Sequence, residues 1–143
     1  MPLRHALIPL HGYGIAAVTA ALMLDPEGVG AARLLAPTEP VPSGVGAVLV
    51  ADTSVYSAVR AEQLLNNPGR PLGRPWLVLI ADAPVRPTPE ARYRLRALGS
   101  RLAGTAVVPY LSCLRDVTGP EAAMEHKPVR AAAAALRRQI EGT

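Results

Sequence analysis

Short, continuous apolar runs alternate along this chain with longer segments of helical character. The runs 47–51 and 76–81 contain only apolar residues, which is typical of strands buried on both faces of a parallel sheet. Each is followed by a segment with helical patterning, and such alternation predicts parallel strands joined by right-handed crossovers. We therefore expect an α/β fold, with a mostly parallel sheet and helices on both faces, in a single compact domain over residues 1–143.

The chemistry of turns and helix ends places the individual elements. Ser54 is a predicted N-cap, and Thr88 followed by Pro89 predicts a second helix start. The expected strands are 6–10, 31–36, 47–51, 76–81 and 105–109. The expected helices are 15–24, 55–65, 89–103, 120–126 and 129–140, the last within a C-terminal helical segment, 127–143, which we expect to dock on the domain.

Composition excludes several classes of protein. Half of the residues are apolar, but there is no Phe and only one Trp, so small aliphatic side chains favour tight packing over a large cavity. Cys113 is the only cysteine, which excludes an internal disulfide, and no His/Cys/Asp spacing indicates a metal site. The arginines are scattered and no recognition motif accompanies them, so no nucleic-acid partner is expected. The absence of a signal-peptide pattern and of an apolar run near 18 residues predicts a cytoplasmic protein with no membrane span.

The turn between the first strand and the first helix has the glycines of a phosphate-binding loop but not its chemistry. His11, Gly12, Tyr13 and Gly14 lead directly into Ile15. Glycines and a helix N-terminus can hold phosphate oxygens, but hydrolysis also needs a Lys for the outer phosphates and a Ser or Thr for magnesium. Positions 15–17 read Ile, Ala, Ala. We therefore expect no nucleotide hydrolysis, while residual ATP or GTP binding by the turn stays an alternative.

Polar residues at the ends of two other strands allow a second reading. Asp52 and Asp82 each follow a strong strand, so both would lie at the carboxyl edge of the sheet, where ligands bind in such folds. They could act as acid and base with His11, or each could cap the turn that follows it. We favour capping, and we expect Cys113 to be a buried small side chain rather than a nucleophile.

Three stretches resemble the ParA/MinD-like branch of P-loop proteins: 11–15, 47–54 and 76–84, the last followed by Val107–Tyr110. More narrowly, the chain is similar to a family of small actinobacterial P-loop-like proteins encoded beside conjugation and type IV secretion genes. The resemblance implies a P-loop-NTPase-like topology and a nucleotide base held by the segment after the last strand, here Tyr110 to Leu114. The candidate binding residues in it are Tyr110, Leu111 and Ser112. The chain departs from the family at Ala16 and Ala17, which replace a Ser-Thr pair, and in lacking an acid after 31–36.

Three hypotheses about function follow. The first is a non-catalytic, P-loop-derived accessory or protein-interaction domain in a conjugation or secretion system, without a resident cofactor and with protein partners. The second is a nucleotide-sensing switch that binds nucleotide at 11–15 and 110–114 without hydrolysing it. The third is a small α/β enzyme that uses Asp52 and Asp82, together with His11, at the sheet edge. The sequence does not indicate an oligomeric state.

Overall fold

The structure is a computed structural model that describes residues 2–10, 14–81 and 83–142. Its strands are β1 (His5–Pro9), β2 (Ala32–Leu34), β3 (Gly46–Ala51), β4 (Trp76–Ile80) and β5 (Gly104–Val108). Its α-helices are α1 (Ile15–Leu24), α2 (Val55–Leu65), α3 (Pro89–Ala97), α4 (Pro120–Ala123) and α5 (Lys127–Glu141), with 3-10 turns η1 (Gly99–Arg101) and η2 (Ser112–Arg115). Every strand and helix expected from the sequence is present, most within two residues at each end.

The five strands form one sheet in the order β2-β1-β3-β4-β5, and every pair is parallel. This is the doubly wound order in which the chain moves outward from β1 to β2 and then crosses to β3 on the other side of β1. The class predicted from the apolar runs, α/β with a parallel sheet, is confirmed, and the arrangement is consistent with a P-loop-like scaffold. The position between β1 and β3 is the topological switch point of the sheet.

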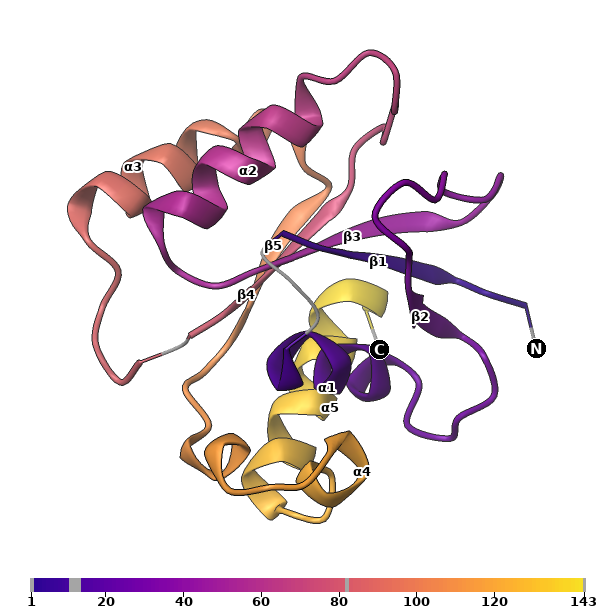
Figure 1. Cartoon of the computed structure of the whole chain (residues 1–143), viewed down its shortest axis with the longest axis vertical. Helices are drawn as coiled ribbons and strands as arrows, with labels where there is room; N and C mark the ends of the chain where they lie inside the picture. Colours follow the sequence, from indigo (N-terminus) through magenta and orange to yellow (C-terminus); the bar gives the residue numbers. More distant parts are fainter. Residues whose placement is uncertain (1, 11–13, 82, 143) are drawn as a thin grey trace.

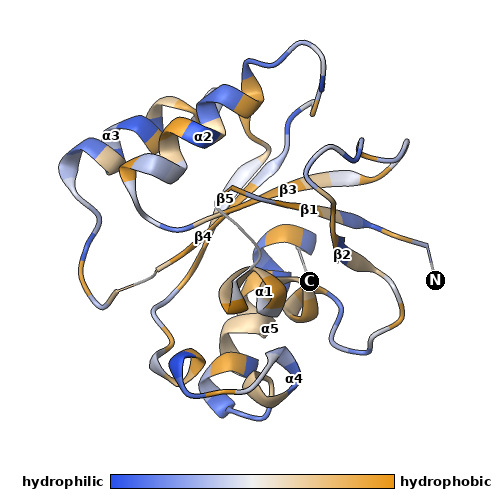
Figure 2. Ribbon diagram, in the orientation of Figure 1, coloured by the Kyte–Doolittle hydropathy of each residue, from blue (hydrophilic) through white to orange (hydrophobic). Residues whose placement is uncertain are grey.

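Helices cover both faces of the sheet, and each layer has its own core (Figure 1). On one face, α1, α4 and α5 pack over β-strand side chains such as Val48, Val78 and Ala106. On the other face, α2 and α3 pack over alternate residues of the same strands, including Leu49 and Leu77. Colouring by hydropathy shows apolar strands between the two layers of helices, with hydrophilic residues on α2 and α3 and a largely apolar α1 (Figure 2). Aliphatic side chains therefore fill both layers, as the composition predicts.

The predicted caps position α2 and α3. The Ser54 side chain accepts a hydrogen bond from the backbone N–H of Ser57 (3.1 Å), and Thr88 accepts one from Ala91 (3.2 Å). The expectation that the third helix runs to residue 103 is wrong, because α3 ends at Ala97 and the chain continues as η1. The sequence Gly99-Ser100 has weak helix propensity. The tighter 3-10 turn η1 lets Leu98 before it and Leu102 after it both enter the core.

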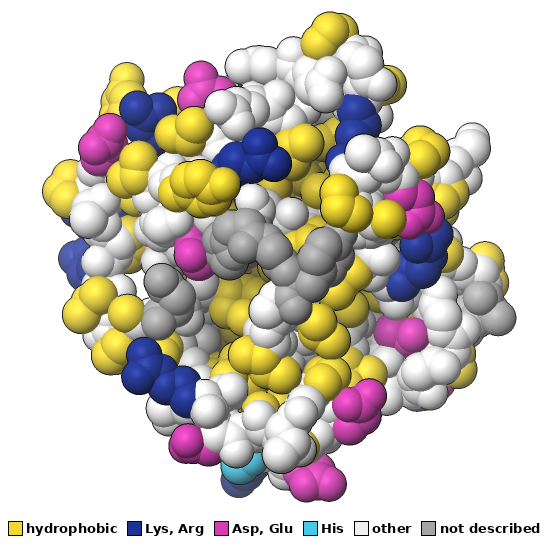
Figure 3. Space-filling view, in the orientation of Figure 1, with side chains coloured by type: hydrophobic (Ala, Val, Ile, Leu, Met, Phe, Trp, Pro, Cys, Tyr) yellow, Lys and Arg dark blue, Asp and Glu magenta, His cyan; other side chains and the backbone are white. Residues whose placement is uncertain are grey.

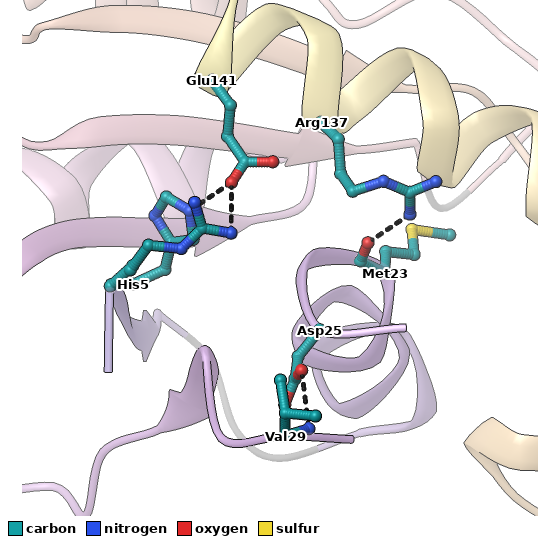
Figure 4. A network of polar contacts seen from close by, with 7 residues as sticks. His5, Met23, Asp25, Val29, Arg137 and Glu141 are labelled. Atoms are coloured by element: carbon teal, nitrogen blue, oxygen red, sulfur yellow. Dashed lines mark hydrogen bonds and ion pairs between the residues drawn. The ribbon is translucent and has the colours of Figure 1, made fainter. Parts of the chain in front are cut away.

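The C-terminal helix docks on its own domain, as expected. Figure 4 shows Arg137 of α5 donating to the backbone carbonyl of Met23 in the last turn of α1 (2.7 Å). The same view shows Glu141 beside His5 of β1, with Glu141 Oε2 3.4 Å from His5 Nε2. The same carboxylate oxygen of Glu141 forms an ion pair with Arg4 (2.9 Å). Asp25 ends α1 by accepting hydrogen bonds from the backbone of the turn that follows it. The first and last helices are thus bound together by polar contacts as well as by apolar packing.

Candidate functional site

The candidate site lies at the carboxyl edge of the parallel sheet, on the face covered by α1 and α5. In doubly wound sheets the loops at the switch point diverge to opposite faces, which leaves a crevice outside the strand ends. Here α1 follows β1 on one face and α2 follows β3 on the other. The described residues form a cavity of about 210 Å³ next to this point.

Apolar side chains make up most of the cavity wall. In the space-filling view, hydrophobic side chains gather around a hollow near the middle of the molecule, between the two layers of helices (Figure 3). They come from the start of α1, from the ends of β3 and β4, and from the segment after β5. The lining residues are Ile15, Ala16, Ala17, Val50, Ala51, Asp52, Ile80, Ala81, Tyr110, Leu111, Leu114 and Arg115. Such a wall suits apolar groups better than it suits a charged phosphate.

Asp52 is the only carboxylate among the described residues that line the cavity, and it takes part in the cap of α2. Its Oδ1 atom accepts hydrogen bonds from the Ser54 backbone N–H (3.0 Å), the Ser54 hydroxyl (2.5 Å) and the Ser57 hydroxyl (2.6 Å). Ser57 is fully buried, so its hydroxyl depends on this acceptor. The arrangement is the capping role favoured from the sequence, because an aspartate often bonds the backbone two residues further on.

The segment after β5 supplies the polar mouth of the cavity. The guanidinium of Arg115 lies 5.9 Å from the centroid of the Tyr110 ring, within the range of a cation–π contact. Arg115 is exposed and Tyr110 is half-buried, so this pair lies at the entrance, while Leu111 is buried behind it. Tyr110 therefore presents a flat apolar surface to the cavity and is supported by a positive charge.

The residues predicted for nucleotide binding are brought together only in part. Ile15, Tyr110 and Leu111 line the same cavity, whereas Ser112 is exposed and is not part of its wall. Gly14 is the N-cap of α1, with an extended backbone and no side-chain cap. His11, Gly12, Tyr13 and Asp82 lie outside the described residues, and so does any contact of Asp52 with Asp82.

Sequence reasoning missed part of the wall. Ile80 ends β4 and Ala81 follows it; the sequence predicts both only as strand residues, although their place at the carboxyl edge was a usable signal. Arg115 belongs to no recognisable motif, and only the η2 turn brings it back over Tyr110.

Thr19 lies a turn too far along α1 to contact a phosphate at the start of the helix. Its side chain is fully buried, and its hydroxyl has no hydrogen-bond partner among the described residues.

Two searches of the described part of the chain gave negative results. No group of three or more His, Cys, Asp or Glu side chains in it could hold a metal ion, and none of its helices combines the length and the apolar character needed to span a bilayer. Comparisons with protein-family models, with curated proteins and with solved structures found no match to this chain.

Proposed function

We propose that this protein is a non-catalytic binding domain whose cavity at the carboxyl edge accepts an apolar side chain of a protein partner. The observation that carries the proposal is the start of α1. Ile15, Ala16 and Ala17 form the cavity wall at the positions where a nucleotide hydrolase needs a lysine and a hydroxyl. By the family resemblance described above, the partner would belong to a conjugation or secretion system.

The size of the cavity supports a protein partner over a whole small molecule. Pockets for small-molecule ligands usually enclose roughly 300–1,000 Å³, and this cavity encloses about 210 Å³. Protein interfaces, by contrast, are often anchored by one aromatic or aliphatic side chain that fills a well-packed pocket. The exposed Arg115 at the rim provides the polar margin that such an anchor needs.

Indole, which reproduces the side chain of tryptophan, is a direct probe of this cavity. In methyl-detected NMR titrations, the resonances of Ile15, Ile80 and Leu111 should shift with indole concentration. The variant Ala16→Phe should fill the cavity and abolish these shifts, while Ala131→Phe, at an exposed position of α5, should respond like the parent protein. Equal responses from the two variants would contradict the assignment of the cavity.

Hydrolysis assays test the non-catalytic part of the proposal. Purified protein should release no phosphate from ATP or GTP above the rate of a buffer blank, with or without magnesium. Turnover that is abolished by Asp52→Asn would overturn the proposal and would favour the enzyme hypothesis, in which Asp52 acts with a second acid.

A nucleotide-sensing switch is the second candidate, and one observation favours it. Tyr110 and Leu111, implied by resemblance to hold a base, line the same cavity as Ile15 at the N-terminus of α1. A nucleotide present at a hundredfold excess over its Kd should stabilise the fold by about 2.7 kcal/mol. A thermal-shift screen with ATP, ADP, GTP and GDP, with and without magnesium, measures this effect. A flat response at millimolar concentration would remove the candidate.

A further inference from the structure

The outer edge of β5 has no strand paired to it in the described part of the chain, and the β5 sequence lacks the charged residues and proline that usually prevent a further strand from pairing. Among the described residues, β4 is the one strand that pairs with β5, and the β5 sequence, Gly-Thr-Ala-Val-Val, contains no charge and no proline. Natural edge strands usually carry lysine, proline or a bulge that blocks pairing. In β5, Thr105 is exposed and Val107 is 54% exposed, whereas Ala106 and Val108 are buried.

The backbone of the same residues faces outward. The carbonyl of Val108 accepts a hydrogen bond from Ala81, which follows β4 (3.0 Å), so Val108 and Ala106 direct their backbone groups toward β4. Successive residues of a strand direct these groups to opposite sides. The N–H and C=O groups of Thr105 and Val107 therefore point away from the sheet, as the edge of an incomplete sheet does.

Helix α3 places positive charge beside this edge. Ala91, Leu95 and Leu98 turn α3 toward the sheet, and Arg94 faces α2, where it pairs with Glu62 (3.8 Å). The residues on the opposite flank of the helix, at spacing of four, are Arg92 and Arg96. Because α2 joins β3 to β4 and α3 joins β4 to β5, this flank faces the β5 side of the sheet. Among the described residues, neither arginine makes an ion pair.

The charge distinguishes between two occupants of the edge. A second copy of the chain would pair β5 with β5 around a two-fold axis and bring Arg92 and Arg96 of both copies to the same side of the joined sheet. Like charges placed together in this way oppose association, and each copy also carries a net charge of +4. An extended segment with acidic side chains would instead complement the two arginines.

We propose that the edge of β5 binds an extended, acidic segment of a partner protein as a sixth strand. Thr105 and Val107 would supply the backbone hydrogen bonds, and every second side chain of the segment would be an Asp or Glu facing Arg92 and Arg96. Main-chain pairing of this kind gives affinity, and alternate side chains give specificity. The surface is distinct from the cavity, so this inference stands independently of the function proposed above.

Amide hydrogen exchange with a model peptide tests the inference. The probe is an eight-residue peptide of alternating valine and glutamate, and the control is the matched valine–lysine peptide. Without peptide, the amides of Thr105 and Val107 should exchange rapidly, while that of Ala106 is protected. The acidic peptide should slow exchange at Thr105 and Val107, and the effect should weaken with added salt because the pairing charges are exposed. The lysine peptide should have no effect.

Matched variants separate backbone pairing from charge. Val107→Pro removes an outward N–H that β4 does not use, and Val107→Thr keeps it, so only the first should abolish binding. The double variant Arg92→Glu/Arg96→Glu should weaken binding at least tenfold, while Arg138→Glu, at an exposed position of α5, should leave it unchanged. Circular dichroism checks that each variant is folded, and the charge variants test the inference even if the proline variant is not.

Two results would overturn the inference. One is the absence of protection at Thr105 and Val107 at millimolar acidic peptide, or equal protection by the lysine peptide. The other is protection of both amides that rises with protein concentration alone, together with a dimer in sedimentation equilibrium. That second result would assign the edge to a second copy of this chain instead.

Discussion

Replacing Asp52 with alanine should destabilise the fold markedly if this carboxylate acts as a cap. The substitution removes the acceptor of three hydrogen bonds, of which the one from Ser57 involves a fully buried hydroxyl. A buried donor left without a partner costs about 1–3 kcal/mol, and the lost turn bond adds about 1 kcal/mol. Asp52 is itself only half-buried, so we expect a total loss of about 2–4 kcal/mol in the free energy of unfolding.

A double-mutant cycle isolates the contact between the two side chains. Ser57→Ala alone removes one donor and should cost about 1–2 kcal/mol. Because the bond between Asp52 and Ser57 can be lost only once, the double variant should be less destabilised than the sum of the single variants by about 1–2 kcal/mol. Urea unfolding followed by far-UV circular dichroism measures all four proteins.

The control is Asp116→Ala, which removes an exposed carboxylate after η2 and should change stability by less than about 0.5 kcal/mol. If Asp52→Ala falls within the same small range, or if the two substitutions are additive, the capping argument is refuted. That result would favour the enzyme hypothesis, in which Asp52 acts with Asp82.

Further substitutions test the packing and the surface charge. Gly104→Ala would place its Cβ 2.5 Å from the Trp76 ring, so the ring must move; we expect a shifted tryptophan emission and a loss of about 1–3 kcal/mol in urea unfolding. Leu136→Ala opens a cavity under α5 and should cost about 2–5 kcal/mol in the same assay. The hydrogen bond from Arg33 lowers the pKa of Glu39 to about 2 from 4.5. This pair therefore stabilises the fold above pH 4.5 and is lost as the pH falls toward 2, so Glu39→Gln should flatten the decline of the urea midpoint across that interval.

The elements were predictable because their boundaries depend on local chemistry. Helix α2 begins after a Ser cap and ends at an Asn-Pro-Gly sequence, and its predicted bounds match those of the structure. The third helix was predicted too long because its end depends on Leu98 and Leu102 reaching one core, which is a tertiary requirement. The low helix propensity of Gly99 indicates that the helix is less stable at this position. It does not by itself predict that the chain continues as a 3-10 turn.

The strand order and the cavity were harder to predict. Strands buried on both faces carry no alternation, so their sequences do not show which neighbours they pair with. Parallel strands place the start of α1 and the segment after β5 at the same edge of the sheet. That Ile15 and Tyr110 line one cavity was implied more narrowly by the family resemblance, because neither segment carries a motif that identifies the other as its neighbour. The role of Asp52 was easier, since the serines that follow it are close in sequence.

The two layers of this molecule draw on different parts of the chain, and this has a consequence for its synthesis. Strands β3 and β4 with α2 and α3 form a continuous block, whereas α1 is completed by α5, and Arg137 contacts Met23 across 114 positions. A ribosome adding about 5–20 residues per second needs on the order of 10 s to proceed from Met23 to Arg137. During that time α5 does not yet cover the apolar surface of α1, so we expect the nascent chain to bind chaperones that recognise exposed hydrophobic segments.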